Sequence, residues 1–260
     1  MSRIVRIFLL LALLVGAAPL QAQTVRVRDT VAFRATQLIA PGVLMAAGVG
    51  IHCWGHDAID VPLYQEFAHL REDKGVLKST DIVLKYVPAL PLIVDLGLGL
   101  TGVPSKYDLQ DRFIEAGLAS VVAGGTCLLM KNLISTRRPD QTNYNSFPSG
   151  HTVLGFVGAE LVRMNYGWGW GLGAYVVASG VAFMRVYSGR HWLSDILFGA
   201  GLGILGAHAG EWLLEPVKDL FNIAIAPLTI GKEKKEIHAA VAPMVDPMSG
   251  TVCAALALHF

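Results

Sequence analysis

The sequence predicts an all-α fold: a polytopic transmembrane bundle of about five or six apolar helices, followed by a short C-terminal β meander. Of the 260 residues, 53% are hydrophobic and only 16% are charged, and the mean hydropathy is +0.50. A soluble domain carries roughly 25% charged residues. Apolar stretches close to the roughly 20 residues that span a bilayer recur along the chain. They cover residues 38–53, 81–101, 113–130, 150–166, 170–187 and 193–214.

The N-terminal residues 1–22 have the pattern of a signal peptide. Arg3 and Arg6 precede the apolar run 7–15, and the small residue Ala22 suits a cleavage site. A retained first transmembrane helix is the alternative. Either reading directs the chain to a membrane.

The six apolar stretches are longer than ordinary strands and therefore favour helices. Between the first two, residues 57–81 form the main polar insertion, in which we expect an interfacial helix. Pro88 and Pro91 are expected to kink the second stretch or to make it re-entrant.

The character of the chain changes after about Asn222. Residues 223–230, 237–245 and 251–260 alternate and are separated by polar turns, which predicts three antiparallel strands. Three strands cannot close a membrane barrel. We therefore expect a helical membrane domain over 23–221 and a small β-rich tail over 222–260.

Charge and cysteine spacing exclude several classes of protein. A net charge of +1 provides no general basic field for nucleic acid. The three cysteines are too far apart for a disulfide framework or a zinc site. They are Cys53, Cys127 and Cys253.

Two further spacings imitate binding motifs. The runs 97–102 and 201–206 match Gly-x-Gly-x-x-Gly, but they lie in apolar helical stretches, so dinucleotide binding is not expected. Small residues four apart in 199–210 instead favour close helix packing. His52 and His56, with acidic residues beyond them, have a metal-like spacing that a polar helix boundary also gives.

The residues that suit catalysis lie in three short segments at predicted helix ends. In the first, Lys131 ends an apolar helix and Arg138 follows seven residues later, held extended by the next proline. Two cations at this spacing can converge on one anion after the chain turns. In the second, Ser149, Gly150 and His151 open an apolar helix. Its free N–H groups suit an anion, which the absent Gly150 side chain lets approach, although Ser149 also suits a plain N-cap.

The third segment runs from Arg185 to Asp195. His191 and Asp195 are four residues apart and would share one face of a helix that begins near Ser188. A carboxylate that accepts from one ring nitrogen fixes the histidine tautomer and leaves the other nitrogen as a nucleophile. Arg185 is placed to return from the preceding helix.

Together the segments supply three cations, a hydroxyl, a helix N-terminus and two histidines. Cations and backbone donors suit the spread charge of a transferring phosphoryl group. One histidine can attack phosphorus while the other protonates the leaving oxygen. No carboxylate cluster for magnesium and no thiolate set for zinc accompanies them, so we expect no metal and no other cofactor.

The motifs Lys131-x6-Arg138-Pro139, Pro148-Ser149-Gly150-His151 and Arg185-x5-His191-x3-Asp195 resemble the signature of the type 2 phosphatidic acid phosphatase superfamily. That superfamily also contains bacterial acid phosphatases and vanadium haloperoxidases. The resemblance covers about residues 113–214 and implies a helical bundle with a covalent phosphohistidine mechanism. It implies that His191 is the nucleophile, Asp195 its orienting acid, and His151 the acid and then the base. The phosphoryl oxygens would be held by Lys131, Arg138, Ser149, Gly150 and Arg185.

The expected function is that of a metal-independent hydrolase of a lipid phosphomonoester or pyrophosphate. The candidate substrates are lipid A, undecaprenyl pyrophosphate, phosphatidylglycerol phosphate and phosphatidic acid. The alternatives are a non-catalytic lipid-phosphate binder and a vanadate-dependent haloperoxidase, which would use the same cradle.

The resemblance also implies a bacterial inner-membrane protein whose active site faces the periplasm. After a cleaved signal, three crossings before Lys131 would place the motifs in the cytoplasm. One of the stretches 38–53 and 81–101 should therefore not cross. We expect it to be 38–53, which is short and has Pro41 and Gly42 near its start.

Overall fold

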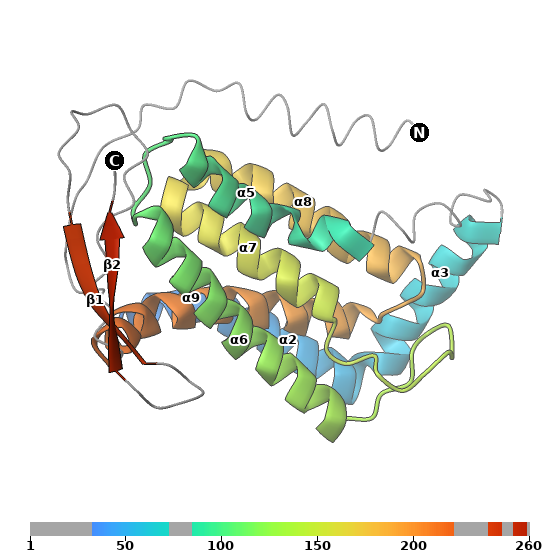
Figure 1. The fold of residues 1–260 in the computed structure, drawn as a ribbon. Coiled ribbons are helices and arrows are strands. Elements are labelled where there is room, and N and C mark those ends of the chain that lie inside the picture. The colour runs from blue at the N-terminus through green and yellow to red at the C-terminus, as the bar shows by residue number, and fades with distance from the viewer. Residues whose placement is uncertain (1–32, 73–84, 221–238, 246–251, 259–260) are drawn as a thin grey trace.

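The computed structural model describes residues 33–72, 85–220, 239–245 and 252–258, and its main body is a helical bundle (Figure 1). The helices are η1 (Ala35–Leu38), α2 (Ile39–Gly50), η2 (Ile51–Asp60), α3 (Val61–Glu72), η3 (Val87–Ala89), α5 (Leu90–Leu100), α6 (Leu109–Leu133), α7 (Gly150–Tyr166), α8 (Trp168–Tyr187) and α9 (Leu193–Leu220).

The predicted helical fold is confirmed for this part of the chain, although four helical runs, and not the expected five or six, are candidate membrane spans. Four helical runs are long and apolar enough to cross a bilayer: Ala35–His69, Leu109–Leu133, Trp168–Tyr187 and Leu193–Leu220. The run Val87–Leu100 is also apolar but shorter. Each of the six predicted stretches therefore corresponds to a helix, although the signal peptide expected at 1–22 lies outside the described residues.

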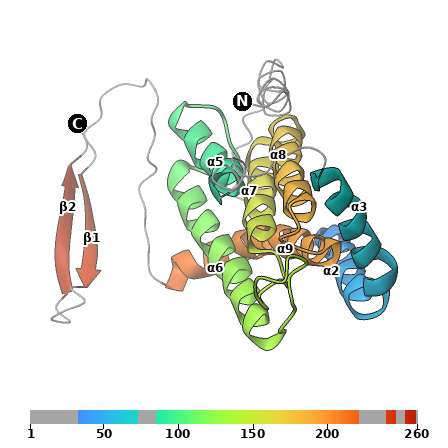
Figure 2. The ribbon, with the colours of Figure 1, turned by 90° about the vertical axis from the view of Figure 1, so that its right-hand side faces the viewer.

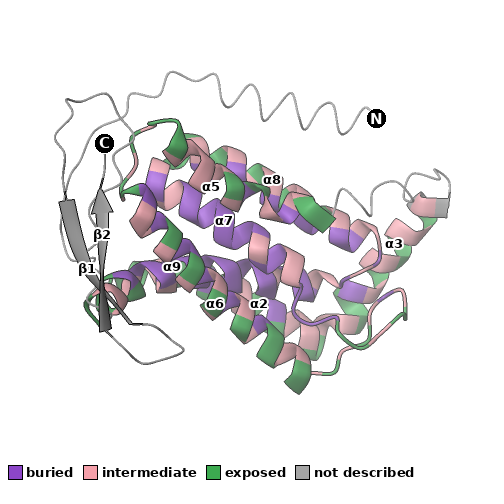
Figure 3. Cartoon of the chain, viewed as in Figure 1, coloured by how far each residue is buried: buried purple, intermediate pink, exposed green. Residues whose placement is uncertain are grey.

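Helix α9 forms the centre of the bundle and packs against α2, α6 and α7 (Figures 1 and 2). It is the most continuously buried of the long helices (Figure 3). Its glycines allow this, because a Cβ at Gly203 would lie 2.6 Å from the Val153 carbonyl of α7. A Cβ at Gly210 would lie 2.6 Å from the Glu115 carbonyl of α6. The small-residue spacing thus brings helix backbones together as predicted.

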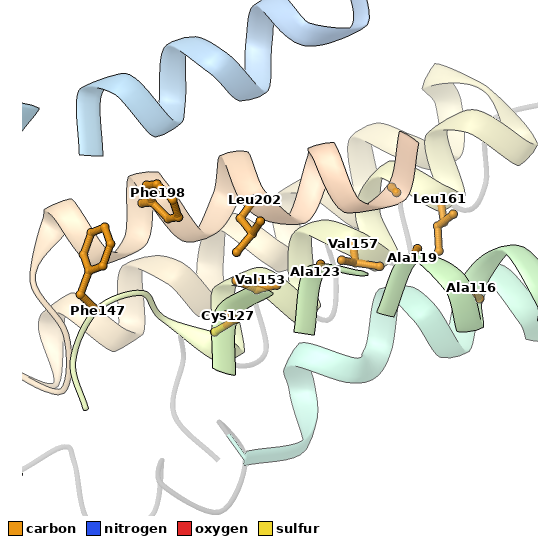
Figure 4. Packing of buried hydrophobic residues seen from close by; sticks show 11 residues of the cluster. Ala116, Ala119, Ala123, Cys127, Phe147, Val153, Val157, Leu161, Phe198 and Leu202 are labelled. Atoms are coloured by element: carbon orange, nitrogen blue, oxygen red, sulfur yellow. The ribbon is translucent and has the colours of Figure 1, made fainter. Parts of the chain in front are cut away.

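The largest core cluster joins α6, α7 and α9 (Figure 4). Small side chains of α6 face larger ones of α7 and α9, so the three helices pack closely. Its buried members include Ala119, Ala123, Val157, Leu161, Phe198 and Leu202. Phe147, from the loop before α7, closes the cluster at one end. This rigid packing fixes the N-termini of α7 and α9 relative to each other.

A second set of contacts fixes the opposite end of the bundle through buried polar groups. The Asn165 amide donates to Asp95 at 3.0 Å and to Glu115 at 3.1 Å. Arg112 donates to the Asp95 carbonyl at 2.7 Å and also to the Tyr166 hydroxyl. Ionisable side chains inside a membrane bundle are costly unless they are paired, so these contacts tie α5, α6 and α7 together.

The described chain begins at the bundle end opposite the three motifs. There, the Trp212 indole near the end of α9 donates to Gln37 at 3.3 Å, and Lys218 pairs with Asp111 at 3.0 Å. At the other end, the His52 ring lies 4.7 Å from Phe147. Helices α2 and α9 therefore run antiparallel along the same length of the bundle.

The expectation that residues 38–53 do not cross stays a prediction, but the short length on which it rested is wrong. These residues belong to the continuous run Ala35–His69, whereas Val87–Leu100 is the shorter one. Pro41 falls in the first turn of α2, where a proline costs no helical hydrogen bond. Pro88 and Pro91 likewise begin η3 and α5 and do not kink a helix interior. The insertion contains the helix α3, which continues directly from η2 as part of the run Ala35–His69 and is not a separate element.

The tail contains two strands, β1 (Ala239–Val245) and β2 (Val252–Leu258), paired antiparallel. They correspond to the second and third predicted strands. The first, 223–230, lies outside the described residues. The three-stranded meander therefore stays a prediction.

Candidate active site

The structure brings the predicted site residues to one end of the bundle, on four helix ends and two loops. Lys131 lies in the last turn of α6, and Arg138 and Ser149 lie in the loop 134–149. Gly150 and His151 lie in the first turn of α7, and Arg185 lies in the last turn of α8. His191 lies in the loop before α9, and Asp195 lies in the first turn of α9.

The loop between α6 and α7 is held by its own polar groups. The Lys131 ammonium donates to the Asn145 carbonyl at 2.7 Å, and the Ser146 amide donates to the Thr136 carbonyl at 3.0 Å. The Arg138 amide donates to the Asn143 carbonyl at 3.0 Å. These contacts fold the loop back on itself, so that Lys131 and Arg138 lie at the same end of the bundle.

His191 is buried and held by two acceptors on one ring nitrogen. Its Nδ1 lies 2.9 Å from the Ser146 carbonyl and 3.3 Å from Asp195 Oδ2. Because both partners are acceptors, Nδ1 carries the ring hydrogen and Nε2 keeps its lone pair. The predicted orientation of His191 by Asp195 is thus present in the geometry, with the Ser146 carbonyl as the nearer partner.

Asp195 is in turn fixed by donors from two directions. Its Oδ2 accepts from the Ser146 hydroxyl at 2.5 Å and from the Trp192 amide at 2.9 Å. The side chain is fully buried. Ser146 therefore contacts both members of the pair, through its carbonyl and its hydroxyl, and the sequence reasoning missed it.

The geometric reason given for the His191–Asp195 contact was wrong. Helix α9 begins at Leu193 rather than near Ser188, so His191 precedes the helix. Gly189, at φ +71°, turns the chain after α8. The contact forms because Asp195, in the first helical turn, reaches back to the Trp192 amide as the acidic half of a capping box does.

The N-terminus of α7 is open for an anion. Ser149 occupies the N-cap position, yet its side chain makes no cap hydrogen bond and instead accepts from the Thr152 hydroxyl at 3.1 Å. A Cβ at Gly150 would meet Cys127 Sγ at 3.8 Å, an ordinary contact, so protein packing does not require the glycine. The first turn of α7 thus offers unmasked backbone donors.

Electrostatics ties the two histidines to the cations. His151, in the first turn of α7 and outside the four candidate spans, has a pKa lowered to about 4 by burial and then by the charges of Arg185, His191, Arg138 and Lys131. Burial also lowers the pKa of His191, which Asp195 partly offsets. The site is therefore strongly positive and keeps both imidazoles neutral in the absence of an anion.

Arg138 points to an occupant of the site. Its Nε is buried and makes no hydrogen bond within the described part of the chain. A buried donor without a partner costs free energy, about 1–3 kcal/mol. A phosphoryl oxygen would satisfy this donor.

The predicted metal-like spacing of His52 and His56 does not form a metal site. Among the described residues no three histidine, cysteine or carboxylate side chains gather as metal ligands. His56 instead pairs with the buried Asp60 at 3.1 Å. Asp60 also accepts from the Ser194 amide and hydroxyl at 3.1 and 2.7 Å, and so braces the start of α9.

Comparison with known proteins identifies one superfamily. Residues 113–215 match the PAP2 superfamily. The chain is 34% identical over 137 residues to a lipid A 1-phosphatase of Porphyromonas gingivalis, a match that covers 51% of this chain and 30% of the relative. It is 41% identical over 71 residues to the bacitracin transport permease protein BcrC of Bacillus licheniformis, covering 26% of this chain and 33% of the relative. The chain thus spans about a third of each curated relative's length.

Two crystal structures resemble the fold. One is Aquifex aeolicus LpxE, with a TM-score of 0.46 and 18% identity, over 58% of this chain and 93% of that chain. The other is a transmembrane PAP2 type phosphatidylglycerolphosphate phosphatase from Bacillus subtilis, with a TM-score of 0.45 and 22% identity, over 72% and 99%. The family assignment rests on the sequence match, which contains all three motifs. The match over residues 113–215 agrees with the superfamily whose signature the three motifs resemble.

Proposed function

We propose that the protein is a metal-independent phosphatase that removes a phosphoryl group from a membrane lipid through a phosphohistidine intermediate. The observation that carries this proposal is the buried His191, whose Nδ1 is held by Ser146 and Asp195 while its Nε2 keeps a lone pair. Phosphate binding alone would need the cations and the helix end, but not this arrangement. The superfamily and the name of the lipid A 1-phosphatase relative support a phosphoric ester hydrolase.

In the first step, Nε2 of His191 attacks phosphorus and the bond from phosphorus to the lipid oxygen breaks. Lys131, Arg138, Arg185, Ser149 and the backbone at Gly150 stabilise the phosphoryl oxygens. His151 gives a proton to the leaving lipid oxygen. The negative charge of bound substrate favours this protonated form of His151, because it offsets the surrounding cations that lower its pKa.

In the second step, His151 takes a proton from water, and the resulting nucleophile attacks the phosphohistidine. The phosphorus–nitrogen bond breaks, inorganic phosphate forms, and His191 regains its lone pair. Asp195 stabilises the positive charge that His191 bears in the intermediate. No metal ion takes part in either step.

The proposed location is the bacterial inner membrane, with the active site facing the periplasm. Because the start of α2 and the motifs lie at opposite bundle ends, this orientation places Gln37 on the cytoplasmic side. A cleaved signal at 1–22 would place Gln37 outside, so it is incompatible with a periplasmic site in this fold. Cysteine labelling from either side of the membrane distinguishes the two orientations. One protein would keep only Cys53, near the site end, and another would have only a cysteine in place of Gln37.

We propose the phosphatase domain over 23–221, with the tail 222–260 as a separate unit. The proposed substrate of the phosphatase domain is one of four lipids that share the same phosphoryl chemistry: lipid A, undecaprenyl pyrophosphate, phosphatidylglycerol phosphate and phosphatidic acid.

Phosphate release by detergent-purified protein tests the proposal. Each of the four lipids and a soluble phosphomonoester would be assayed in excess EDTA, beside His191→Ala and the matched surface variant His69→Gln. Turnover of at least one lipid, unaffected by EDTA and lost only in His191→Ala, is expected. Lipid binding without turnover would leave a non-catalytic binder, and halogenation only with added vanadate would indicate a haloperoxidase.

A further inference from the structure

Beside the phosphoryl site lies a pocket of about 520 Å³, and of its lining residues the proposed reaction uses Arg138 alone. Its walls come from η2, from α3 and from the loop after α6. It shares only Arg138 with the predicted phosphate-binding set, and it is also lined by Trp192, which follows the buried His191 in the chain. The polar residues that give it its character are His52, His56, Tyr64, Gln65, Arg137 and Arg138.

The charge of the lining suits an anion. The pocket has two arginines and two histidines, and none of its described lining residues is acidic. His52 Nδ1 is buried and has no hydrogen-bond partner within the described residues. A buried ring nitrogen without a partner indicates that a ligand group completes the site.

His56 is oriented toward such a role by its other contacts. Its Nδ1 is held by Asp60 at 3.1 Å, which leaves Nε2 to meet a ligand. The His56 ring also stands edge-on to the Trp192 indole, with centroids 4.6 Å apart. Its side chain is 38% exposed, whereas that of Asp60 is fully buried. The His56 imidazole is thus held by a buried carboxylate on one side and is accessible from the pocket on the other.

The backbone that carries both histidines is unusual. Residues Ile51–Asp60 form a π-helix, in which the Val61 amide donates to the His56 carbonyl five residues earlier. π-Helical turns are rare in proteins, and those that occur are often found at functional sites. The opposite wall is fixed as well, because the Trp192 indole donates to the Arg137 carbonyl at 2.8 Å.

We propose that this pocket is a second phosphate subsite, which selects lipids that carry another phosphate a few atoms from the phosphoryl group removed. The inference rests on the proposed function and names its substrate class. Two lipid types share this chemistry: a prenyl diphosphate, where the second phosphate is directly attached, and phosphatidylglycerol phosphate, where it is a phosphodiester. Arg138 borders both the subsite and the cradle and links the two groups.

Paired substrates test the subsite. Kinetics of wild type, His56→Gln and Arg137→Gln would be measured on a prenyl diphosphate and its monophosphate, and on phosphatidylglycerol phosphate and phosphatidic acid. We expect His56→Gln to raise KM roughly tenfold for the lipids with a second phosphate, with kcat and both monophosphate lipids unchanged. Arg137→Gln, at an exposed position, should have a smaller effect that salt abolishes. His69→Gln, on the exposed side of α3, is the matched control.

The four lipids also identify the source of the second phosphate. An effect on the prenyl diphosphate alone assigns a directly attached phosphate, and an effect on phosphatidylglycerol phosphate alone assigns a phosphodiester. Equal losses on lipids with and without the second phosphate would overturn the proposal, because His56 would then only support the start of α9 through Asp60. The proposal would also be overturned if His56→Gln and Arg137→Gln both left KM unchanged for the lipids with a second phosphate.

A binding measurement separates this inference from the enzymatic proposal. Inorganic pyrophosphate and inorganic phosphate would be titrated into His191→Ala protein, which does not turn over. We expect roughly tenfold tighter binding of pyrophosphate, and loss of that preference when His56→Gln is added. If wild type hydrolyses no lipid, the phosphatase proposal fails while this preference still decides the subsite. Equal binding of the two anions contradicts the subsite.

Discussion

Replacing Ser146 by alanine isolates the contact that the sequence did not reveal. The substitution removes the hydroxyl that donates to Asp195 at 2.5 Å but keeps the backbone carbonyl that accepts from His191. Asp195 retains the Trp192 amide as a donor. The loss is therefore one buried hydrogen bond to a charged acceptor.

Hydrogen bonds to charged groups contribute about 1.5–3 kcal/mol. Asp195 stabilises the positive charge that His191 acquires when it attacks phosphorus, so we expect most of this loss in the transition state. At 1.36 kcal/mol for each factor of ten, kcat should fall roughly 10- to 100-fold, with little change in KM.

The assay is steady-state phosphate release from whichever lipid the wild type hydrolyses, with the thermal midpoint measured in the same detergent. Thr142→Ala is the matched control, because it removes a hydroxyl from the same loop that contacts Asp140 rather than Asp195. Wild-type kcat in a folded Ser146→Ala protein would refute the role of Ser146. Equal losses in the two variants would show that only loop order matters.

Three further predictions concern other parts of the molecule. Gly150→Ala should leave stability within about 0.5 kcal/mol, since its Cβ meets only Cys127 at 3.8 Å, yet it should reduce activity by blocking the approach of the anion. Gly199→Ala should lower both stability and activity, because its Cβ lies 3.0 Å from the Ser149 carbonyl. Thermal melts and kinetics on both variants check this, and an unaffected rate in Gly150→Ala would contradict it. In an NMR titration of the free protein, the pKa of His151 should be near 4 and the pKa of His191 should lie below its ordinary value. Arg138→Gln should raise the pKa of His151, because a positive charge is removed. A His151 midpoint at 6.5 would be inconsistent with the positive site. Asn165→Leu removes the amide that donates to both Asp95 and Glu115, far from the site. It should lower the free energy of unfolding by about 2 kcal/mol and leave kcat of the folded protein unchanged. An unchanged melting temperature would contradict this prediction.

The helices and the set of catalytic residues could be predicted because they depend on local properties. Apolar length identifies a membrane helix, and six stretches became six helical segments. Residue types such as His191 and Asp195 carry their chemistry wherever the chain places them. The motifs also indicated the superfamily that the comparison then identified over residues 113–215.

The missed features depend on tertiary contacts that no spacing encodes. Ser146 lies in an irregular loop without periodicity, so only the folded chain brings its hydroxyl to Asp195. The start of α9 was placed at Ser188 because a helical face explained the His191–Asp195 spacing, although Gly189 supplied a turn signal. The first membrane helix was judged too short because the polar residues after Cys53 hid its continuation through η2 and α3.

The most direct test of the phosphohistidine mechanism is to trap the intermediate. Wild-type protein would be mixed with lipid labelled in its phosphoryl group, quenched in alkali within the first turnovers, and digested for mass spectrometry. We expect label on His191 in wild type, slower labelling and slower release in a His151→Ala protein, and no label in His191→Ala. Turnover with no label on His191, or turnover that survives His191→Ala, would contradict this mechanism.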